Sequence, residues 1–192
     1  MLYYACMEII FKKVCNKNVK TALQVQHSIF PDEHGDKEIF QAIGKEKLDT
    51  LFLSRDLWLA YFESFEPVGI LGIYSYKEYP ETAWLDWFGI LPNHRHKGYG
   101  SKLLEFAIIQ ATQLGFESLR LWTDDKGNAG AVAFYQKVGF DLEIYSNLND
   151  EHFQEGNTVI LSVGLNGKRV KKWKNKNIYL KQFYHDVLGK KQ

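Results

Sequence analysis

The fold of this chain is decided by one continuous stretch, Leu85–Phe140, which reads LDWFGILPNHRHKGYGSKLLEFAIIQATQLGFESLRLWTDDKGNAGAVAFYQKVGF. Its apolar residues switch between strand and helix spacing, with glycine-containing turns in between. The pattern predicts a strand that ends at Pro92, a turn, a helix that runs to about Leu114, a second strand at Ser118–Thr123 and a second helix.

The first turn has the composition of an anion-binding site. Arg95–Gly100 reads RHKGYG and opens the first helix, whose initial N–H groups have no partner within the helix and lie at its positive end. Gly98 and Gly100 allow a phosphate to approach the backbone, and Arg95 and Lys97 add positive charge. The alternative is a tight turn with solvated charges, which the glycines alone do not exclude.

The second half of the stretch makes the anion-binding interpretation more specific. Asn128–Phe140 reads NAGAVAFYQKVGF, and four of its side chains share one helical face, namely Ala131, Phe134, Tyr135 and Val138. Together the two halves resemble the GNAT superfamily of acyl-coenzyme A-dependent N-acyltransferases. The phosphate signature of that family matches Arg95, Gly98 and Gly100, and its later signature matches Asn128, Ala131, Tyr135, Gly139 and Phe140.

The resemblance implies acetyl-coenzyme A as cosubstrate and no metal. Its pyrophosphate would bind at the helix start, and its pantetheine arm would pair with backbone near Phe88–Ile90. Gly89 would permit close approach there, and a backbone N–H would polarise the thioester carbonyl. The expected cofactor-binding residues are Phe88, Gly89, Ile90, Arg95, His96, Lys97, Gly98, Tyr99, Gly100, Ser101, Asn128 and Tyr135.

Tyr135 is the expected catalytic acid. The resemblance places its hydroxyl near the sulfur of the cosubstrate, and a phenol stays protonated at neutral pH and can donate to the departing thiolate. The alternative is a core aromatic beside Phe134 on an apolar helix face. Asn128, at the start of the same helix, is expected to serve as N-cap and as a cofactor contact.

Asp86 is the expected base, acting directly or through water. Period-two alternation places it on one face of the central strand with Trp84, Phe88 and Ile90. A carboxylate among aromatic rings has its charged form disfavoured, which raises its pKa toward neutrality. The alternatives are a structural hydrogen bond, or binding of the substrate amine by the carboxylate as an anion.

The acceptor site is expected to draw on acidic and aromatic residues. The turn Pro31–Gly35 lies in the region that usually forms one wall of the acceptor site in the resembled family, and its Asp32 and Glu33 would attract a cationic amine. Trp84 and Trp87 are candidates to line the pocket or to contact a cation. An ordinary solvated loop and core tryptophans are the alternatives.

The remaining pattern completes an α/β fold. Two helices are expected within Asn18–Lys47, the first over Val19–Ile29. An antiparallel meander is expected to lead into the central strand, with strands at Leu57–Phe62, Val68–Tyr76 and Ala83–Ile90. Two more strands are expected after Phe140, at Asp141–Tyr145 and Thr158–Val163. The predicted order is βααβββαβαββ, with a mixed, mostly antiparallel GNAT-like sheet and helices on both faces.

The charge and composition of the chain limit the classes of function that it can have. The chain has 192 residues and a net charge of +1, which gives no general attraction for nucleic acid or membrane. Two cysteines and no long apolar run predict a reducing, cytoplasmic location. Met7 is an alternative start to Met1.

We expect a domain over residues 1–167 and a basic, aromatic tail over residues 168–192. From Lys168 onward there are nine Lys or Arg residues against one acid. The tail is expected to form an amphipathic helix that packs on the domain or on a second subunit in a homodimer; contact with RNA or an acidic partner is the alternative.

The sequence therefore predicts an acetyl-coenzyme A-dependent N-acetyltransferase that acts on a primary amine of a small molecule or peptide. The reaction is expected to be a direct attack in a ternary complex. A non-catalytic acyl-coenzyme A-binding regulatory or interaction module is the alternative.

Overall fold

The computed structural model describes residues 8–145 and 157–173. Within them the elements follow the order β1, α1, α2, β2, β3, β4, η1, α3, β5, α4, β6, β7. Their bounds are β1 (Ile9–Lys13), α1 (Val19–Ile29), α2 (Asp36–Ala42), β2 (Phe52–Phe62), β3 (Pro67–Tyr76), β4 (Tyr79–Ile90), the 3-10 turn η1 (Pro92–His94), α3 (Tyr99–Gln113), β5 (Ser118–Asp124), α4 (Ala129–Lys137), β6 (Asp141–Tyr145) and β7 (Thr158–Gly164).

The strands form one seven-stranded sheet within the described residues, in the order β1-β2-β3-β4-β5-β7-β6. Neighbouring strands are antiparallel except β4 and β5, which run parallel. A parallel pair needs a crossover connection, and α3 supplies it. The predicted mixed, mostly antiparallel sheet is therefore confirmed.

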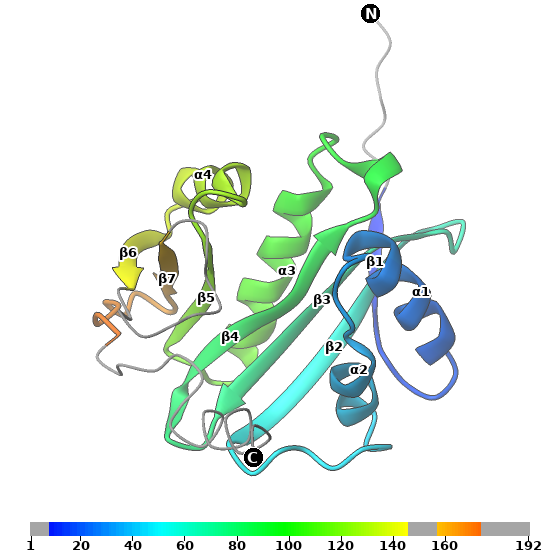
Figure 1. The fold of residues 1–192 in the computed structure, drawn as a ribbon, viewed down its shortest axis with the longest axis horizontal. Coiled ribbons are helices and arrows are strands. Elements are labelled where there is room, and N and C mark those ends of the chain that lie inside the picture. Colours follow the sequence, from blue (N-terminus) through cyan, green and yellow to red (C-terminus); the bar gives the residue numbers. More distant parts are fainter. Residues whose placement is uncertain (1–7, 146–156, 174–192) are drawn as a thin grey trace, which may run out of the picture.

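Helices cover both faces of the sheet, as Figure 1 shows for α3 on one side and α1 and α2 on the other. One core forms between the sheet, α3 and α4, and includes the fully buried Leu103, Ala107 and Leu119. A second core lies beneath α1 and α2, around Ala22 and Ile39. The sheet is thus the middle of three layers, and two-sided burial explains why β3 is apolar almost throughout.

The predicted order of elements is confirmed, with η1 as an addition. The strands β2 and β4 begin earlier than expected, because their first residues also pair with β3. The first helix and β6 have the predicted bounds, Val19–Ile29 and Asp141–Tyr145. In α4, Val132 joins the core while Ala131 and Val138 are exposed, so the buried face is narrower than the sequence pattern indicated.

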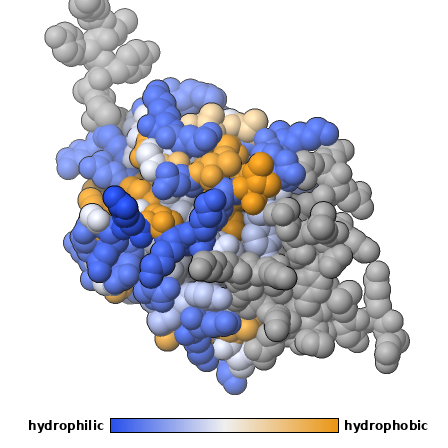
Figure 2. Space-filling model, turned by 90° about the vertical axis from the view of Figure 1, so that its left-hand side faces the viewer, coloured by the Kyte–Doolittle hydropathy of each residue, from blue (hydrophilic) through white to orange (hydrophobic). Residues whose placement is uncertain are grey.

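The far edge of the sheet is partly apolar on its outer surface. Figure 2 views the molecule from the side that carries α4 and β6, and apolar residues gather there among hydrophilic ones. The large exposed apolar side chains from these two elements and their junction are Val138, Leu142 and Ile144.

The first residues of the predicted tail pack on the domain. The guanidinium of Arg120, a 4% exposed residue of β5, donates to the carbonyl of Lys171 and to Ser162 Oγ at 2.8 Å. The backbone N–H of Trp173 donates to the two carboxylate oxygens of Glu143 at 3.0 and 3.2 Å. Buried charged groups therefore hold this part of the chain against the sheet. The predicted tail helix over the later residues lies outside the described part of the chain.

The ring of Trp173 extends the aromatic core at this end of the sheet. Its centroid lies 5.0 Å from that of Trp84, in an edge-to-face arrangement, and 4.5 Å from that of Tyr79. Arg120 contributes a cation over the same ring at 5.6 Å. These contacts match the geometry in which aromatic pairs stabilise a core beyond their buried area.

We predict that Trp173→Ala lowers the free energy of unfolding by about 2 kcal/mol, because it removes the ring that packs against Trp84, Tyr79 and the Arg120 guanidinium. Urea denaturation followed by circular dichroism measures this change. Trp173→Phe should recover part of the loss, and an unchanged urea midpoint for Trp173→Ala would show that the contact contributes nothing.

Candidate functional site

The site lies where β4 and β5 separate. These parallel strands pair over three positions, Thr82 with Ser118, Ala83 with Leu119 and Trp84 with Arg120. Both strands continue beyond this point, β4 to Ile90 and β5 to Asp124, without further pairing between them among the described residues. The backbone of β4 is therefore open on its β5 side, and the two strands diverge in Figure 1.

A bulge in β4 sets the direction of the side chains at this opening. Opposite β3, Asp86 pairs with Gly72 and Gly89 pairs with Ile70, so Trp87 and Phe88 together face one residue. Trp87 has a φ of 43°, in the left-handed region that residues other than glycine seldom adopt. A bulge of this kind re-aims side chains and commonly lies next to functional sites.

The bulge makes one expectation wrong. Asp86 shares its face with Trp84 as predicted, but Phe88 and Ile90 point to the α3 side and pack in the core there. Trp87 instead packs with α1 and α2, on the side of Asp86. The extra residue shifts the alternation by one position, which period-two counting along the sequence cannot reveal.

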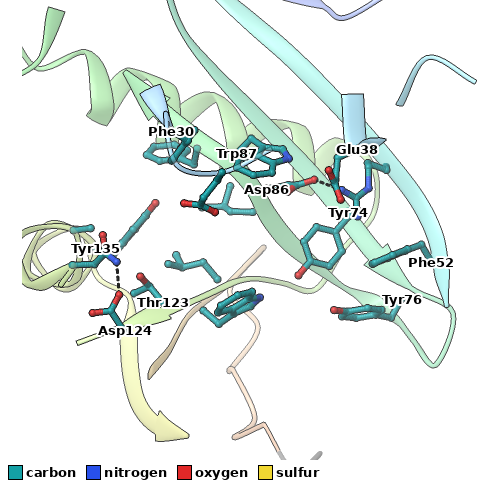
Figure 3. Close-up of a pocket in the computed structure, with 18 residues that line it drawn as sticks. Phe30, Glu38, Phe52, Tyr74, Tyr76, Asp86, Trp87, Thr123, Asp124 and Tyr135 are labelled. Atoms are coloured by element: carbon teal, nitrogen blue, oxygen red, sulfur yellow. Dashed lines mark hydrogen bonds and ion pairs between the residues drawn. The ribbon is translucent and has the colours of Figure 1, made fainter. Parts of the chain in front are cut away.

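The separated strands border a cavity of ≈ 570 Å³. Eighteen residues line it: Phe30, Glu33, Glu38, Phe52, Arg55, Tyr74, Tyr76, Leu85, Asp86, Trp87, Phe88, Leu121, Trp122, Thr123, Asp124, Asn128, Ala131 and Tyr135. Figure 3 shows Asp86 and Tyr135 on opposite sides of this space, with Phe30 and Trp87 along one side between them. The structure thus brings the two expected catalytic residues to one cavity.

Asp86 is held by Arg55 of β2. Arg55 Nη1 donates to Asp86 Oδ2 at 2.7 Å, and the two side chains are 5% and 14% exposed. Burial raises the pKa of Asp86 to about 6, although the positive charge of Arg55 acts in the opposite direction. This carboxylate is therefore largely ionised at neutral pH and still basic enough to accept a proton.

Tyr135 projects from α4 and is 5% exposed. Its ring lies in an aromatic group with Phe88 (5.8 Å between centroids), Phe134 (5.2 Å) and Phe140 (5.3 Å). Burial raises the pKa of its hydroxyl above the ordinary value, so the group stays protonated and able to donate. Tyr135 is therefore both part of the hydrophobic core and part of the cavity lining.

The start of α3 fits a diphosphate. Gly98, the N-cap, has a φ of 83°, a conformation that glycine adopts without strain, and no side chain caps the helix. A methyl group added at Gly100 would meet Phe134 Cζ at 3.9 Å as its nearest neighbour, so the space in front of this backbone is open. The first N–H groups of a 15-residue helix therefore remain available to an anion.

The side chains of this turn are placed in different ways. Arg95 Nε donates to the Ile90 carbonyl at 3.0 Å, and Lys97 Nζ donates to the Asn93 carbonyl at 2.8 Å. These bonds fold both cations back over the turn. His96 is exposed with a φ of 60°, while the Tyr99 ring is buried against Phe62, which leaves backbone as the part of Tyr99 that a ligand could contact. Ser101 follows in the first turn of the helix.

Two of the expected cofactor-binding residues, Asn128 and Gly89, also have a role in the packing of the protein itself. Asn128 is the N-cap of α4 as predicted, but its side chain donates to Asp124 Oδ2 and makes no capping bond to the helix. Its amide orientation is thereby fixed at the cavity wall. A side chain at Gly89 would collide with Ile29 Cγ2 at 2.5 Å, so glycine at this position is required by the packing of α1.

The expected acceptor residues divide into two groups. Glu33 and Trp87 line the cavity, whereas Asp32 is exposed outside the lining. Trp84 is fully buried and supports the wall from behind, stacked on Tyr74 at 6.3 Å between centroids.

Sequence reasoning missed several lining residues, chiefly Phe30, Glu38, Phe52, Arg55, Tyr74, Tyr76, Thr123 and Asp124. No local pattern marks Arg55 as a site residue, because it lies in the polar run Ser54–Asp56 of β2 and its partner Asp86 is distant in the sequence. In the described residues no group of three or more His, Cys, Asp or Glu side chains is arranged to hold a metal, and no helix there is long and apolar enough to span a membrane.

The fold is similar to those of solved acetyltransferases. The ribosomal-protein-S18-alanine N-acetyltransferase from Escherichia coli superposes with a TM-score of 0.63 at 15% identity, covering 86% of this chain and 99% of that one. A GNAT-family putative acetyltransferase from Desulfovibrio desulfuricans gives 0.65 at 17% identity, covering 82% and 99%. Spermidine N-acetyltransferase from Vibrio cholerae, solved with CoA and spermine, gives 0.61 at 16% identity, covering 81% and 95%.

At these identities the superpositions establish the fold, and the sequence comparison establishes the family. No curated protein matches the sequence. The model of the acetyltransferase (GNAT) family matches residues 19–140, which is more than half of the chain. This range contains β4, β5, the start of α3 and all eighteen residues that line the cavity. The chain therefore belongs to the GNAT family of acetyltransferases.

Proposed function

We propose that the protein transfers an acetyl group from acetyl-coenzyme A to a primary amine, with both substrates bound at once. The observation that carries the proposal is the placement of Asp86 and Tyr135 around one cavity at the separation of β4 and β5. A base and an acid with pKa values moved apart by their surroundings form the pair that such a transfer needs.

The start of α3 and the open backbone of β4 would hold the cosubstrate. The N–H groups from Tyr99 to Ser101 would receive the diphosphate, and the bulge around Phe88 would leave backbone groups for the pantetheine arm. When bound, acetyl-coenzyme A supplies an activated acetyl group on a thiol leaving group. The similar Vibrio cholerae enzyme was solved with CoA, which supports coenzyme A as the kind of ligand.

Asp86 would act on the attacking nitrogen and Tyr135 on the leaving sulfur. The neutral amine attacks the acetyl carbon, and Asp86 accepts one proton from its nitrogen, directly or through water, as the nitrogen–carbon bond forms. Tyr135 donates its hydroxyl proton to sulfur as the carbon–sulfur bond breaks. The products are an acetamide and free coenzyme A, and a proton from Asp86 returns to solvent as Tyr135 is reprotonated.

Arg55 would hold the Asp86 carboxylate in place and adjust its pKa. The 2.7 Å ion pair fixes the carboxylate on the cavity wall and partly offsets the effect of burial on its pKa. The alanine and spermidine acceptors in the names of the solved relatives are both primary amines, which supports an amine as the acceptor class.

We predict that Tyr135→Phe lowers kcat for acceptor-dependent coenzyme A release about a hundredfold, because the leaving thiolate loses its proton donor. The assay combines acetyl-coenzyme A with a panel of amines and a thiol-reactive dye. Calorimetry should give an unchanged Kd for coenzyme A. Tyr61→Phe removes another buried phenol hydroxyl, outside the cavity lining, and serves as the matched control. Full activity in Tyr135→Phe would contradict the assignment.

We predict an acidic limb near pH 6 in the profile of kcat/KM, since a base works in its ionised form and Asp86 ionises as the pH rises through about 6. Arg55→Met should move this limb to higher pH, because it removes the charge that lowers the pKa of Asp86. Asp86→Asn should abolish the limb and most of the activity.

The control for these profiles is Lys13→Met, which breaks the 2.6 Å pair between Lys13 and Asp56 away from the cavity lining. Its limb should stay near pH 6. An unshifted limb in Arg55→Met would show that Asp86 is not the group that controls the rate.

A further inference from the structure

The cavity has two ends of different chemistry. Tyr135 and Asp124 lie at the end formed by α4 and β5, where the proposed transfer would take place (Figure 3). Beyond Asp86 the lining comes from α2 and β3, through Glu38 and Tyr74 (Figure 3), and from β2, whose Arg55 is paired with Asp86. This second end is left for the part of the acceptor that does not react.

The cavity lining contains more carboxylates than positively charged groups. Its ionisable carboxylates are Glu33, Glu38, Asp86 and Asp124, against the single guanidinium of Arg55. Arg55 is engaged by Asp86, and Asp124 accepts bonds from a backbone N–H and the Asn128 amide. Neither of the two glutamates has a Lys, Arg or His partner in the part of the chain that the structure describes.

Glu38 lies close enough to Asp86 to affect its ionisation. The negative charge of Glu38 raises the pKa of Asp86, in addition to the larger effect of burial. Two neighbouring carboxylates repel each other, and a cation beside them relieves this repulsion. The rim residue Glu33 belongs to a turn that is held in place, since Gln26 Nε2 donates to its carbonyl at 3.2 Å.

The same end provides aromatic faces. Phe52, Tyr74 and Tyr76 form a cluster with centroid separations of 5.2 to 5.4 Å. The Arg55 guanidinium already lies over Phe52 at 4.7 Å and over Tyr74 at 5.3 Å, so this cluster accommodates positive charge.

The wall also has an unsatisfied polar group. The indole N–H of Trp87 is buried and has no hydrogen-bond partner within the described residues. Buried donors are normally paired, so a polar occupant, water or the acceptor, completes this wall. Trp87 also has the left-handed backbone conformation at the bulge, and such conformations are common at ligand sites.

The reacting nitrogen must be uncharged when it attacks, so it does not account for both free glutamates. Resting on the proposed function, we infer that the acceptor is an aliphatic amine that carries a second amino group, which stays protonated at neutral pH. Glu38 binds this second group beside the aromatic cluster, and Glu33 adds charge at the rim. The specificity of the site is therefore for aliphatic diamines and polyamines over monoamines and amino acids.

The test compares putrescine with n-butylamine and γ-aminobutyrate, which have the same chain length and differ in the group at the far end. Coenzyme A release should give kcat/KM at least about tenfold higher for putrescine than for butylamine, since a charge-assisted hydrogen bond contributes at this scale. The anionic γ-aminobutyrate should be the poorest acceptor. Glu38→Gln should lower the putrescine-to-butylamine ratio about tenfold, because any effect of the substitution on Asp86 applies to both acceptors and only putrescine loses a contact.

Glu46→Gln, an exposed acid outside the lining, is the matched control and should leave the ratio unchanged. Equal kcat/KM for putrescine and butylamine, or an unaffected ratio in Glu38→Gln, would overturn the inference while upholding acetyl transfer. Calorimetry with putrescine separates the two claims. Binding that Glu38→Gln weakens, without any coenzyme A release, would support the inference and overturn the proposed function; the absence of both binding and release would overturn the inference.

Discussion

The site depends on the early end of pairing between β4 and β5. Three paired positions, from Thr82 to Trp84, keep the sheet continuous and bury its middle. Beyond these positions, the backbone N–H and C=O groups that β4 and β5 turn toward each other need hydrogen-bond partners other than the neighbouring strand. The space between them becomes a cavity because α4 and the bulge in β4 place side chains around it without filling it.

The rest of the molecule supports this opening from both faces. On one face α3 packs on the sheet and presents its start near the opening, with Gly98 in the left-handed conformation that directs the chain into the helix. On the other face Ile29 and Phe30 press on Gly89, and Gly35 leaves room for the Trp87 ring. Packing thus fixes the position of Asp86, and Arg55 fixes its orientation.

Much of the fold was predictable from the sequence. The spacing of apolar residues and the glycine turns give the element order, and the pair of motifs around Gly98 and Tyr135 leads to the family, which the match over residues 19–140 confirms. Asp86 was selected because a carboxylate among aromatic rings has a raised pKa, and it does line the cavity; its role as base stays a prediction. These are local patterns, and local patterns survive in a single sequence.

What escaped prediction depends on contacts between distant segments. Arg55 and Asp86 are 31 positions apart, and register between β2, β3 and β4 brings them together. The bulge at Trp87 reverses the alternation after Asp86, and no glycine or proline marks that position. Glu38 reaches the cavity only because α2 packs over the sheet, so its role follows from tertiary structure.

The most direct test of the account is a titration of isotope-labelled protein with coenzyme A, followed by the backbone amide resonances. If the open edge of β4 and the start of α3 form the cosubstrate site, the largest shifts will be those of Phe88–Ile90 and Tyr99–Ser101. Amides of the edge strand β1 and of the first turn of α1, at the opposite end of that helix from Gly89, will change little. Shifts confined to those distant elements, or none at saturating coenzyme A, would contradict the central claim.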